Sequence, residues 1–306
     1  MGYYMGIDLG GTRIKGCVTT HEGDIVTQTV ISTDPHSGQQ AVLDRALRLS
    51  EELLAKAKVR VNAIGVGICG PTNVDKGILI TSPILVGWNN VPLRDIFQDR
   101  LAIQTIIDND ANLAILGETF SGVAKGARNV IGFTVGTGVG GAVIIDGNIY
   151  RGSHWYGGEL GHMTVKPNGH PCPCGNRGCL TVEASSKRII ERYAQFANCS
   201  SVTLKEVFNL AKENDRQAYA AVIPMVEALA IGVANVLNVF DPDYVVIAGG
   251  PTRTGRWLLE LLIENVHGKV FGDLSRQVRV EFANLDEWAG AIGAAGFAYQ
   301  FFSQKH

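Results

Sequence analysis

The sequence predicts an α/β protein of two domains, and three observations support this fold class. Short apolar segments with the pattern of strands alternate with amphipathic helical patterns, 37 glycines mark many tight turns, and 306 residues are enough for two domains of ordinary size. Hydrophobic residues make up 46% of the chain and charged residues 18%, which excludes a disordered or fibrous protein. The order of the elements indicates mixed sheets backed by helices.

The chain begins with an apolar strand that breaks at a glycine turn and continues as a second strand. Asp8 lies at the end of the first strand. Gly10 and Gly11 can adopt backbone angles closed to other residues, and Thr12 adds a hydroxyl where the chain reverses. Such a turn presents backbone N–H groups to an anion.

Residues 131–142 repeat this pattern around the turn Gly136-Thr137-Gly138. Either turn alone is equally compatible with an ordinary β-hairpin, because short glycine patterns often match by accident. Two hairpins of one design in the same chain predict two halves that face one ligand.

Between the hairpins, residues 22–31 are expected to form a further strand. A helix capped by Ser37 follows, because leucines recur on one of its faces at helical spacing. Residues 61–68 form a short apolar strand. Residues 77–92 show no clear period and are expected to form an irregular loop, a kind of segment that is often functional.

A carboxylate is predicted at the carboxyl end of a strand. Residues 93–101 form a short helix, residues 104–107 a strand and residues 111–123 a helix, so that Asp110 falls between the last two. Open α/β sheets place their ligands at this position. An aspartate there could also simply cap the helix, and this feature alone leaves both roles open.

One histidine and three cysteines follow with the spacing of a metal site. Nine, one and four residues separate His162, Cys172, Cys174 and Cys179. One imidazole and three thiolates make a tetrahedral set suited to structural Zn²⁺. The alternative is three reduced surface thiols, which would be an oxidation liability. The spacing therefore predicts a zinc knuckle over residues 162–179.

Helical patterns dominate the region after the knuckle, at residues 185–196 and 204–214. The next helical segment, residues 218–240, is apolar enough to suggest a membrane span. Glu227 lies near its middle, close to Pro224, so a buried core helix explains the segment better.

A third glycine turn follows a strand at residues 244–248. At Gly249 and Gly250 a flat ring could lie against bare backbone, although a plain strand end fits as well. The remaining elements are a helix at residues 255–266, a strand at 278–282 and a helix at 289–302.

We expect an N-terminal α/β domain of residues 1–108 and a C-terminal α/β domain of residues 109–288 that contains the knuckle. The last helix, within residues 289–306, is rich in alanine and glycine and is expected to pack closely against the first domain.

The formal net charge is −2, and no basic run or mixture of aromatic and basic residues indicates a nucleic-acid surface. No secretory signal opens the chain, so a cytoplasmic protein is expected. The glycine turns and the strand-end carboxylate together suit a nucleotide clamp for phosphoryl transfer, with Asp110 as base.

Five motifs together resemble the ROK family of sugar kinases, repressors and uncharacterised reading frames. They are Asp8-Leu-Gly-Gly-Thr12, Asn109-Asp-Ala-Asn112, Gly136-Thr-Gly138, Gly158-Glu-Leu-Gly-His162 and Cys172-Pro-Cys-Gly-Asn-Arg-Gly-Cys179. The motifs run in order over essentially the whole chain. The resemblance implies the two-domain actin-like ATPase fold of hexokinases, with a cleft between the domains, and an ATP-dependent hexose kinase.

The resemblance also implies a role for each site residue. Asp110 would take the proton from the sugar hydroxyl, at C6, as it attacks the γ-phosphate. The residues implied to bind the sugar are Gly70, Asn109, Asp110, Glu159 and His162. One nitrogen of His162 would ligate zinc while the other faces the sugar.

On the nucleotide side, Asp8 would bind Mg²⁺ through water and Lys15 would add a positive charge, although family members place a lysine either there or at the position of Arg13. Gly249 and Gly250 would meet adenosine. The residues implied to hold the phosphates are Gly10, Gly11, Thr12, Gly136, Thr137 and Gly138.

The chain departs from the family pattern at two positions. Thr181 stands where the family has a glutamate, and Glu183, two positions later, is expected to reach the same sugar hydroxyls. Ile84 replaces an asparagine in the loop before Gly87. Both departures are expected to touch the sugar side and not the ATP side.

We expect a glucokinase-like hexose 6-kinase that forms a homodimer or larger homo-oligomer. A kinase for N-acetylmannosamine or another amino sugar or hexose is the alternative. A sugar-responsive repressor is disfavoured, because the glycine turn lies within ten residues of the start and leaves no room for a helix-turn-helix. A sugar-binding protein without catalysis is the third class.

Overall fold

The computed structural model describes residues 2–199, 201–272 and 277–303, which fall into two compact units. The first unit comprises residues 1–126, 151–157 and 285–306, and the second comprises residues 127–150 and 158–284. Each unit contains a five-stranded sheet packed by helices, so the predicted α/β class is confirmed.

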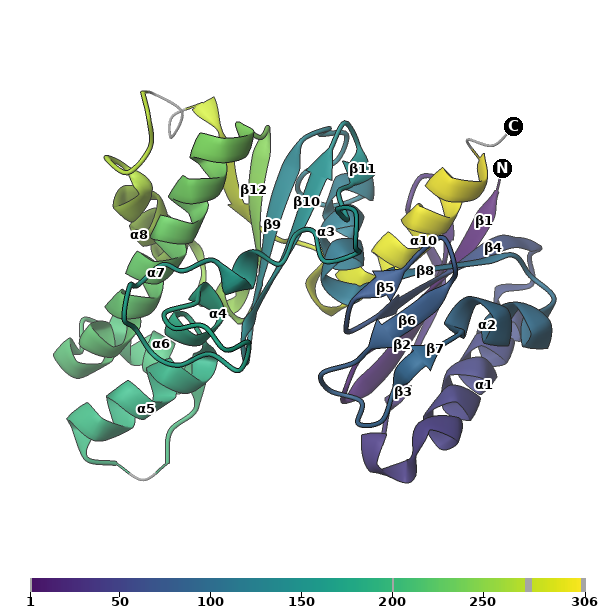
Figure 1. Cartoon of the computed structure of the whole chain (residues 1–306), viewed down its shortest axis with the longest axis horizontal. Coiled ribbons are helices and arrows are strands. Elements are labelled where there is room, and N and C mark those ends of the chain that lie inside the picture. The colour runs from purple at the N-terminus through teal and green to yellow at the C-terminus, as the bar shows by residue number, and fades with distance from the viewer. Residues whose placement is uncertain (1, 200, 273–276, 304–306) are drawn as a thin grey trace. The chain divides into compact units, whose positions relative to one another are not determined.

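The sheet of the first unit has the strand order β3-β2-β1-β4-β8 (Figure 1). Its strands are β1 (Tyr3–Leu9), β2 (Arg13–Thr20), β3 (Ile25–Ser32), β4 (Val61–Ile68) and β8 (Thr105–Asn109). The first three are antiparallel neighbours, whereas β4 and β8 run parallel to β1. The central strands β1 and β4 are buried along almost their whole length, as is usual for strands covered on both faces.

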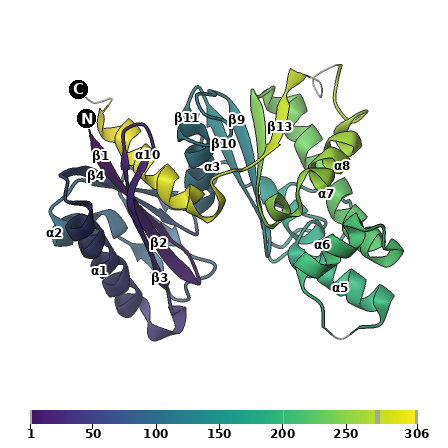
Figure 2. The same cartoon turned by 180° about the vertical axis from the view of Figure 1, so that it is seen from behind.

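Helices cover both faces of this sheet (Figure 2). They are α1 (Gln39–Ala57), α2 (Leu93–Leu101), α3 (Asp110–Phe120) and α10 (Ala289–Ser303). The last of these packs against β1, β4 and α3. Glycines allow this contact, because a Cβ atom on Gly6 would lie 1.8 Å from the carbonyl oxygen of Ala291, and one on Gly65 would lie 1.9 Å from that of Ala294.

The division into units differs from the expected boundary near residue 108. Helix α3 stays with the first unit because it packs against α10, and the chain enters the second unit only after Gly126. Residues 151–157 return to the first unit, and no pattern in the sequence signalled this excursion.

The segment 77–92, expected as an irregular loop, contains two short strands. β6 (Ile78–Thr81) pairs with β7 (Asn89–Val91) and with β5 (Thr72–Asn73) in a small sheet. Strands of two to four residues are too short to show an alternating hydrophobic pattern, so the sequence did not reveal them.

The sheet of the second unit has the order β11-β10-β9-β12-β13. Its strands are β9 (Val130–Val135), β10 (Val139–Ile145), β11 (Asn148–Ile149), β12 (Tyr244–Gly249) and β13 (Arg279–Phe282). Two antiparallel neighbours again lie on one side of the central strand and two parallel strands on the other. The two units therefore repeat one sheet topology, and the first two glycine turns join corresponding strands, β1 to β2 and β9 to β10.

The second unit is built around a long apolar helix. Its helices are α4 (Leu180–Glu183), α5 (Ser186–Ala197), α6 (Leu204–Lys212), α7 (Arg216–Phe240) and α8 (Arg256–Val266). By length and composition α7 could cross a membrane, but 67% of its most apolar window is buried within the unit. It packs against α5, α6 and α8, and Glu227 lies on its exposed face. This helix is the core helix expected from the sequence.

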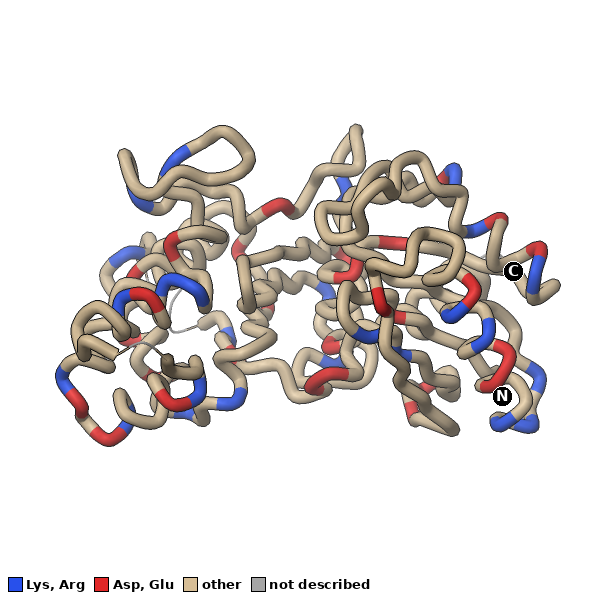
Figure 3. The backbone as a smooth tube through the Cα atoms, turned by 90° about the horizontal axis from the view of Figure 1, so that it is seen from below, with Lys and Arg blue, Asp and Glu red and all other residues tan. Residues whose placement is uncertain are grey.

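Charged residues of both signs are interspersed along both units (Figure 3). This distribution agrees with the formal net charge of −2.

Candidate active site

Three parallel strands of the first unit end at one edge of its sheet. Leu9 is paired in register with Ile68, and Ile68 is paired with Asn109. The first glycine turn, the Cys69-Gly70 turn and Asp110 follow these strand ends directly. The parallel register therefore brings together predicted site residues that lie up to about a hundred positions apart in the sequence.

Asn109, and not Asp110, caps helix α3. The side-chain oxygen of Asn109 accepts hydrogen bonds from the backbone N–H groups of Ala111 and Asn112, at 2.9 and 3.2 Å. Its amide nitrogen donates to the carbonyl oxygen of Gly70, at 3.2 Å. Asn109 therefore occupies the cap position that the sequence left open for Asp110. Asp110 is the first residue of the helix, and its carboxylate accepts a hydrogen bond from the Ala111 N–H at 2.9 Å.

The environment of Asp110 suits a general base. Burial raises the pKa of Asp110 to about 6, and the negative charge of Asp8 adds to this effect. The N–H groups of Ala111 and of Asp110 itself, together with the thiol of Cys69, stabilise the carboxylate and partly oppose the rise. A carboxylate with this pKa is ionised at neutral pH and is a stronger base than an exposed aspartate.

Asp8 and Lys15 form a cross-strand pair beside the first glycine turn. The Lys15 ammonium lies 3.6 Å from the Asp8 carboxylate, and both side chains are more than four-fifths buried. Burial raises the pKa of Asp8, and the charge of Lys15 opposes this rise. Arg13, the alternative basic position, instead forms an ion pair with Glu287 at 2.9 Å. Oxygen ligands such as the Asp8 carboxylate suit Mg²⁺.

The second glycine turn is held in place by two side chains that follow the knuckle. Both the backbone N–H and the hydroxyl of Ser186 donate to the carbonyl oxygen of Gly136, at 3.0 and 2.7 Å. The hydroxyl oxygen of Thr181 accepts from the N–H of Val139, at 2.8 Å, and leaves no room for a side chain at Gly138. The loop conformation thus depends on residues about 45 positions later in the chain.

The third glycine turn lies next to the second. Gly249 is paired in register with Val135, the last residue before the second turn. Gly249 has a positive φ of 96°, and a Cβ atom there would lie 2.2 Å from the carbonyl oxygen of Val135. Only glycine fits this position, so the structure brings Gly249 and Gly250 to the same sheet edge as the second hairpin.

Glu159 and His162 lie on one tight turn of the second unit. The 3₁₀ helix η2 (Leu160–His162) packs on β10, and both side chains are exposed. A Cβ atom on Gly161 would lie 1.8 Å from the carbonyl oxygen of Val139, so the turn rests directly on β10, the strand that follows the second glycine turn.

The four predicted zinc ligands form a compact cluster. All of their ligand atoms lie within 4.8 Å of one another. The Sγ atoms of Cys174 and Cys179 are 3.7 Å apart, and Nδ1 of His162 lies 3.6 Å from Sγ of Cys172. A tetrahedral Zn²⁺ with ordinary bond lengths would separate two sulfurs by about 3.8 Å and a sulfur from a nitrogen by about 3.6 Å. The cluster therefore has the dimensions of a zinc site.

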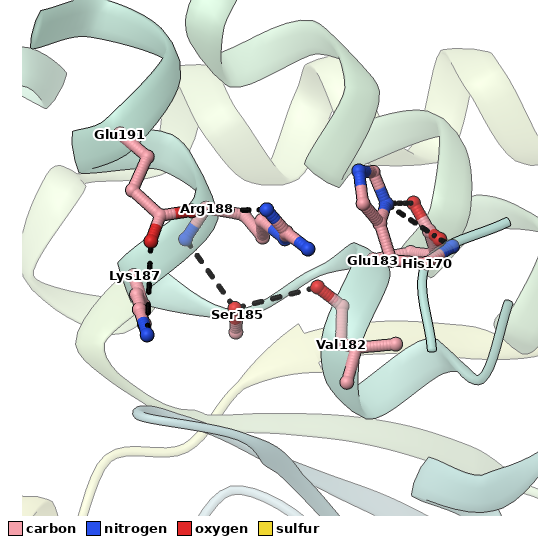
Figure 4. Close-up of polar contacts among 7 residues, drawn as sticks. All are labelled: His170, Val182, Glu183, Ser185, Lys187, Arg188 and Glu191. Carbon is pink, nitrogen blue, oxygen red and sulfur yellow. Dashed lines mark hydrogen bonds and ion pairs between the residues drawn. The ribbon is translucent and has the colours of Figure 1, made fainter. Parts of the chain in front are cut away.

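Glu183 bonds to His170 within the knuckle loop (Figure 4). Its carboxylate accepts from the His170 backbone N–H at 2.7 Å, and the imidazole Nδ1 lies 3.0 and 3.1 Å from its two oxygens. Burial alone would raise the pKa of Glu183, but these bonds hold it below its usual value. Contact of Glu183 with a sugar stays a prediction.

Thr181 and Ile84, the two departures expected to touch the sugar side, each contact a turn to which the resemblance assigns the phosphates. Thr181 holds the backbone of the second glycine turn. Ile84 lies against the first, because a Cβ atom on Gly11 would come within 2.9 Å of its Cδ1 atom. The sequence could not show this, because both contacts join segments far apart in the chain.

Comparison with known proteins agrees with the motifs. The model of the ROK family matches residues 4–300. A protein named glucokinase from Halalkalibacterium halodurans is 32% identical, over 97% of this chain and 95% of the relative. A xylose repressor from Caldicellulosiruptor bescii is 30% identical, over 96% of this chain and 77% of the relative.

Solved structures show the same fold. The ROK hexokinase from Thermus thermophilus has a TM-score of 0.88 at 31% identity, with 99% of each chain covered. A ROK family glucokinase from Streptomyces griseus, in complex with glucose and AMPPNP, has a TM-score of 0.83 at 27% identity, with 98% of this chain and 100% of that chain covered. The predicted actin-like ATPase fold of hexokinases is confirmed.

The cysteine cluster predicts a structural metal. We expect about one zinc per chain by elemental analysis, and we expect Cys174→Ser, or removal of zinc by a strong chelator, to lower the melting temperature because the metal links the ends of the knuckle. Cys199→Ser, which changes a thiol outside the cluster, is the control. Metal-free protein with an unchanged melting temperature would contradict a structural role.

Proposed function

This chain belongs to the ROK family, and from that membership and the geometry of the strand ends we propose that it is an ATP-dependent hexose kinase. It transfers the γ-phosphate to the 6-hydroxyl of a hexose, with glucose as the leading substrate. The observation that carries the proposal is Asp110, which lies at the sheet edge next to Asp8 and the first glycine turn and has a pKa of about 6.

Asp110 acts as the general base. Its carboxylate accepts the proton of the sugar hydroxyl while the hydroxyl oxygen forms a bond to the γ-phosphorus. The bond from that phosphorus to the β,γ-bridging oxygen breaks, and ADP leaves with the electron pair. Phosphoryl transfer needs chiefly position and electrostatic support, so one well-placed base is sufficient protein chemistry for this step.

The first glycine turn and its neighbours serve the phosphates. Gly10 closes the turn, because its N–H donates to the carbonyl oxygen of Arg13 at 3.2 Å. The N–H groups of Gly11 and Thr12 would meet the phosphates, and Lys15 supplies a positive charge beside Asp8. Asp8 would hold Mg²⁺ through water, and bound Mg²⁺ would neutralise charge on the phosphate oxygens. In the second unit, the turn at residues 136–138 and the Gly249-Gly250 turn would hold phosphates and adenosine.

Sugar recognition is assigned to polar groups near the base and near the knuckle. Asn109, whose amide is oriented by Gly70 and by the start of α3, lies next to Asp110. Glu159 and His162 provide an exposed carboxylate and an imidazole on one turn. Because Nδ1 of His162 points to Cys172, Nε2 would be the nitrogen that meets a sugar hydroxyl. Zn²⁺ in the knuckle would orient this ring.

Glucose is preferred over other hexoses because the curated relative from Halalkalibacterium halodurans is named glucokinase and the Streptomyces griseus structure contains glucose. The alternative is an amino sugar such as N-acetylmannosamine. An ADP-coupled assay with Mg·ATP over glucose, mannose, fructose, allose and N-acetylated hexosamines distinguishes them. Release of ADP with none of these sugars would contradict the kinase proposal.

A sugar-sensing role is the second candidate, since the chain is 30% identical to a xylose repressor. A protein with this role binds a sugar without forming ADP, and its Asp110 has no catalytic task. Sugar binding measured by calorimetry in the absence of ADP formation would favour sensing.

Replacing the base provides the most direct test. Asp110→Asn should lower kcat by at least about a thousandfold while sugar affinity changes little, because the amide keeps the shape but cannot accept the proton. The variant should be at least as stable as the parent at pH 7.5, since the raised pKa shows that the folded protein disfavours the ionised form. An Asp110→Asn enzyme with near-parental turnover would contradict the assignment of Asp110 as base.

The raised pKa of Asp110 predicts the acid limb of the pH profile. Below pH of about 6 the carboxylate is protonated and cannot accept a proton, so kcat/KM should rise tenfold per pH unit below 6 and level off above it. The residual rate of Asp110→Asn should lack this limb. A parental profile without a limb between pH 5 and 7 would show that another group is the base.

The contact of Thr181 predicts an effect on ATP and not on sugar. Thr181→Val keeps the side-chain shape but removes the acceptor of the Val139 N–H, so the second glycine turn should loosen and the KM for ATP should rise by about five- to tenfold. Thr181→Ser keeps the acceptor and serves as control. A rise in the KM for sugar with an unchanged KM for ATP would contradict this prediction and would indicate that Thr181 supports sugar binding.

A further inference from the structure

A second carboxylate, Asp108, is buried two residues before the proposed base. Only 1% of Asp108 is exposed. One of its oxygens accepts from the backbone N–H of Asn109 at 2.7 Å and from the side-chain amide of Asn112 at 3.1 Å. The other oxygen accepts from Nε of Arg151 at 2.8 Å and also from its Nη2. Asp108 therefore receives hydrogen bonds from a strand end, a helix and an arginine.

Arg151 is the partner that allows this charge to be buried, because an isolated carboxylate in such a position would be strongly destabilised. The arginine side chain is itself 19% exposed. Its guanidinium carbon lies 5.0 Å from the centroid of the Phe297 ring on α10, which covers one of its faces. Arg151 is also the residue at which the chain re-enters the first unit from the second.

Asp108 forms hydrogen bonds to residues on both sides of Asp110 in the sequence. Asp108 binds the backbone of Asn109 before Asp110 and the side chain of Asn112 after it. Asn109 in turn binds the N–H groups of Ala111 and Asn112. The backbone at the junction of β8 and α3 is thus held on both sides of Asp110. The Asp110 carboxylate in turn accepts a hydrogen bond from the Ala111 N–H at 2.9 Å.

We infer that Asp108 and Arg151 are positioning residues for the base Asp110. Asp108 fixes the backbone that carries Asn109 and Asp110, and Arg151 acts through Asp108 by keeping its carboxylate in place. This inference rests on the proposed kinase function. In an ordinary structural ion pair, replacing either residue lowers stability alone. Replacing Asp108 or Arg151 should also lower turnover.

Glu118 provides a matched control for a purely structural role. It lies on the same helix α3, is fully buried, and accepts hydrogen bonds from the backbone N–H groups of Val123 and Leu285, both at 2.9 Å. Glu118 lies about two helical turns after Asp110, and its bonds hold the segments at Val123 and Leu285. Glu118→Gln therefore measures what disturbing a buried carboxylate of this unit does to stability alone.

The experiment compares Asp108→Asn, Arg151→Gln, Arg151→Lys, the double variant Asp108→Asn/Arg151→Gln, and Glu118→Gln. Each variant of the whole 306-residue chain is assayed with Mg·ATP and its best hexose, and its folded fraction is measured by thermal unfolding. Asp108→Asn and Arg151→Gln should each lower kcat by about ten- to a hundredfold, since small displacements of a reacting group have effects of this size. The KM for ATP should change by less than about twofold.

Two further results are expected if Arg151 acts through Asp108. Arg151→Lys, which keeps the charge, should recover most of the kcat lost in Arg151→Gln. The double variant should be no slower than Asp108→Asn, because two residues in one chain of contacts have non-additive effects. Glu118→Gln should lower the melting temperature with kcat within about twofold of the parent.

The inference is overturned if Asp108→Asn and Arg151→Gln lose only melting temperature, as Glu118→Gln does, or if their effects on kcat multiply. Absence of ADP formation by the parent would instead overturn the proposed function. In that case hydrogen exchange at the backbone amides of residues 109–112 tests the positioning role without an activity assay. Asp108→Asn should speed the exchange of these amides, and Glu118→Gln should not. Unchanged exchange in Asp108→Asn overturns the positioning role.

Discussion

The site of the first unit depends on the parallel register of β1, β4 and β8. Because Leu9, Ile68 and Asn109 align across these strands, the three segments that follow them meet at one sheet edge. The second unit repeats this arrangement with β9 and β12, which aligns Gly249 with the start of the second glycine turn. Backbone hydrogen bonding between strands thus brings together residues that the sequence keeps far apart.

The buried carboxylates at this sheet edge lower the stability of the folded protein at neutral pH, although the proposed chemistry needs them. Burial raises the pKa of both Asp8 and Asp110, so the folded protein holds two carboxylates that would ionise more readily in water. Lys15 offsets part of this for Asp8, and backbone N–H groups at the start of α3 offset part of it for Asp110. The neighbouring Asp108 is neutralised by Arg151. For Asp110, the groups that oppose the rise in pKa are backbone N–H groups and the Cys69 thiol, and they include no cationic side chain.

Local patterns predicted much of the fold and the family. The α/β class, the buried apolar helix and membership of the ROK family are confirmed, since each rests on hydrophobic periodicity or on a motif with few alternatives. The short strands β5 to β7 and the excursion of residues 151–157 were missed. Two- to four-residue strands carry no period, and an excursion between units is defined by its distant contacts.

The sequence alone determined which chemical groups this protein has and in which turns they lie: glycines where backbone must approach a ligand, Asp110 at a strand end, and a histidine with three cysteines at metal spacing. Only the tertiary structure decided that Asn109 occupies the cap position of α3, that Thr181 holds the second glycine turn, and that Arg151 pairs with Asp108. The physical reason is that propensity and spacing act within a few residues. A hydrogen bond between segments about forty positions apart exists only once strand register and helix packing have brought its two atoms together.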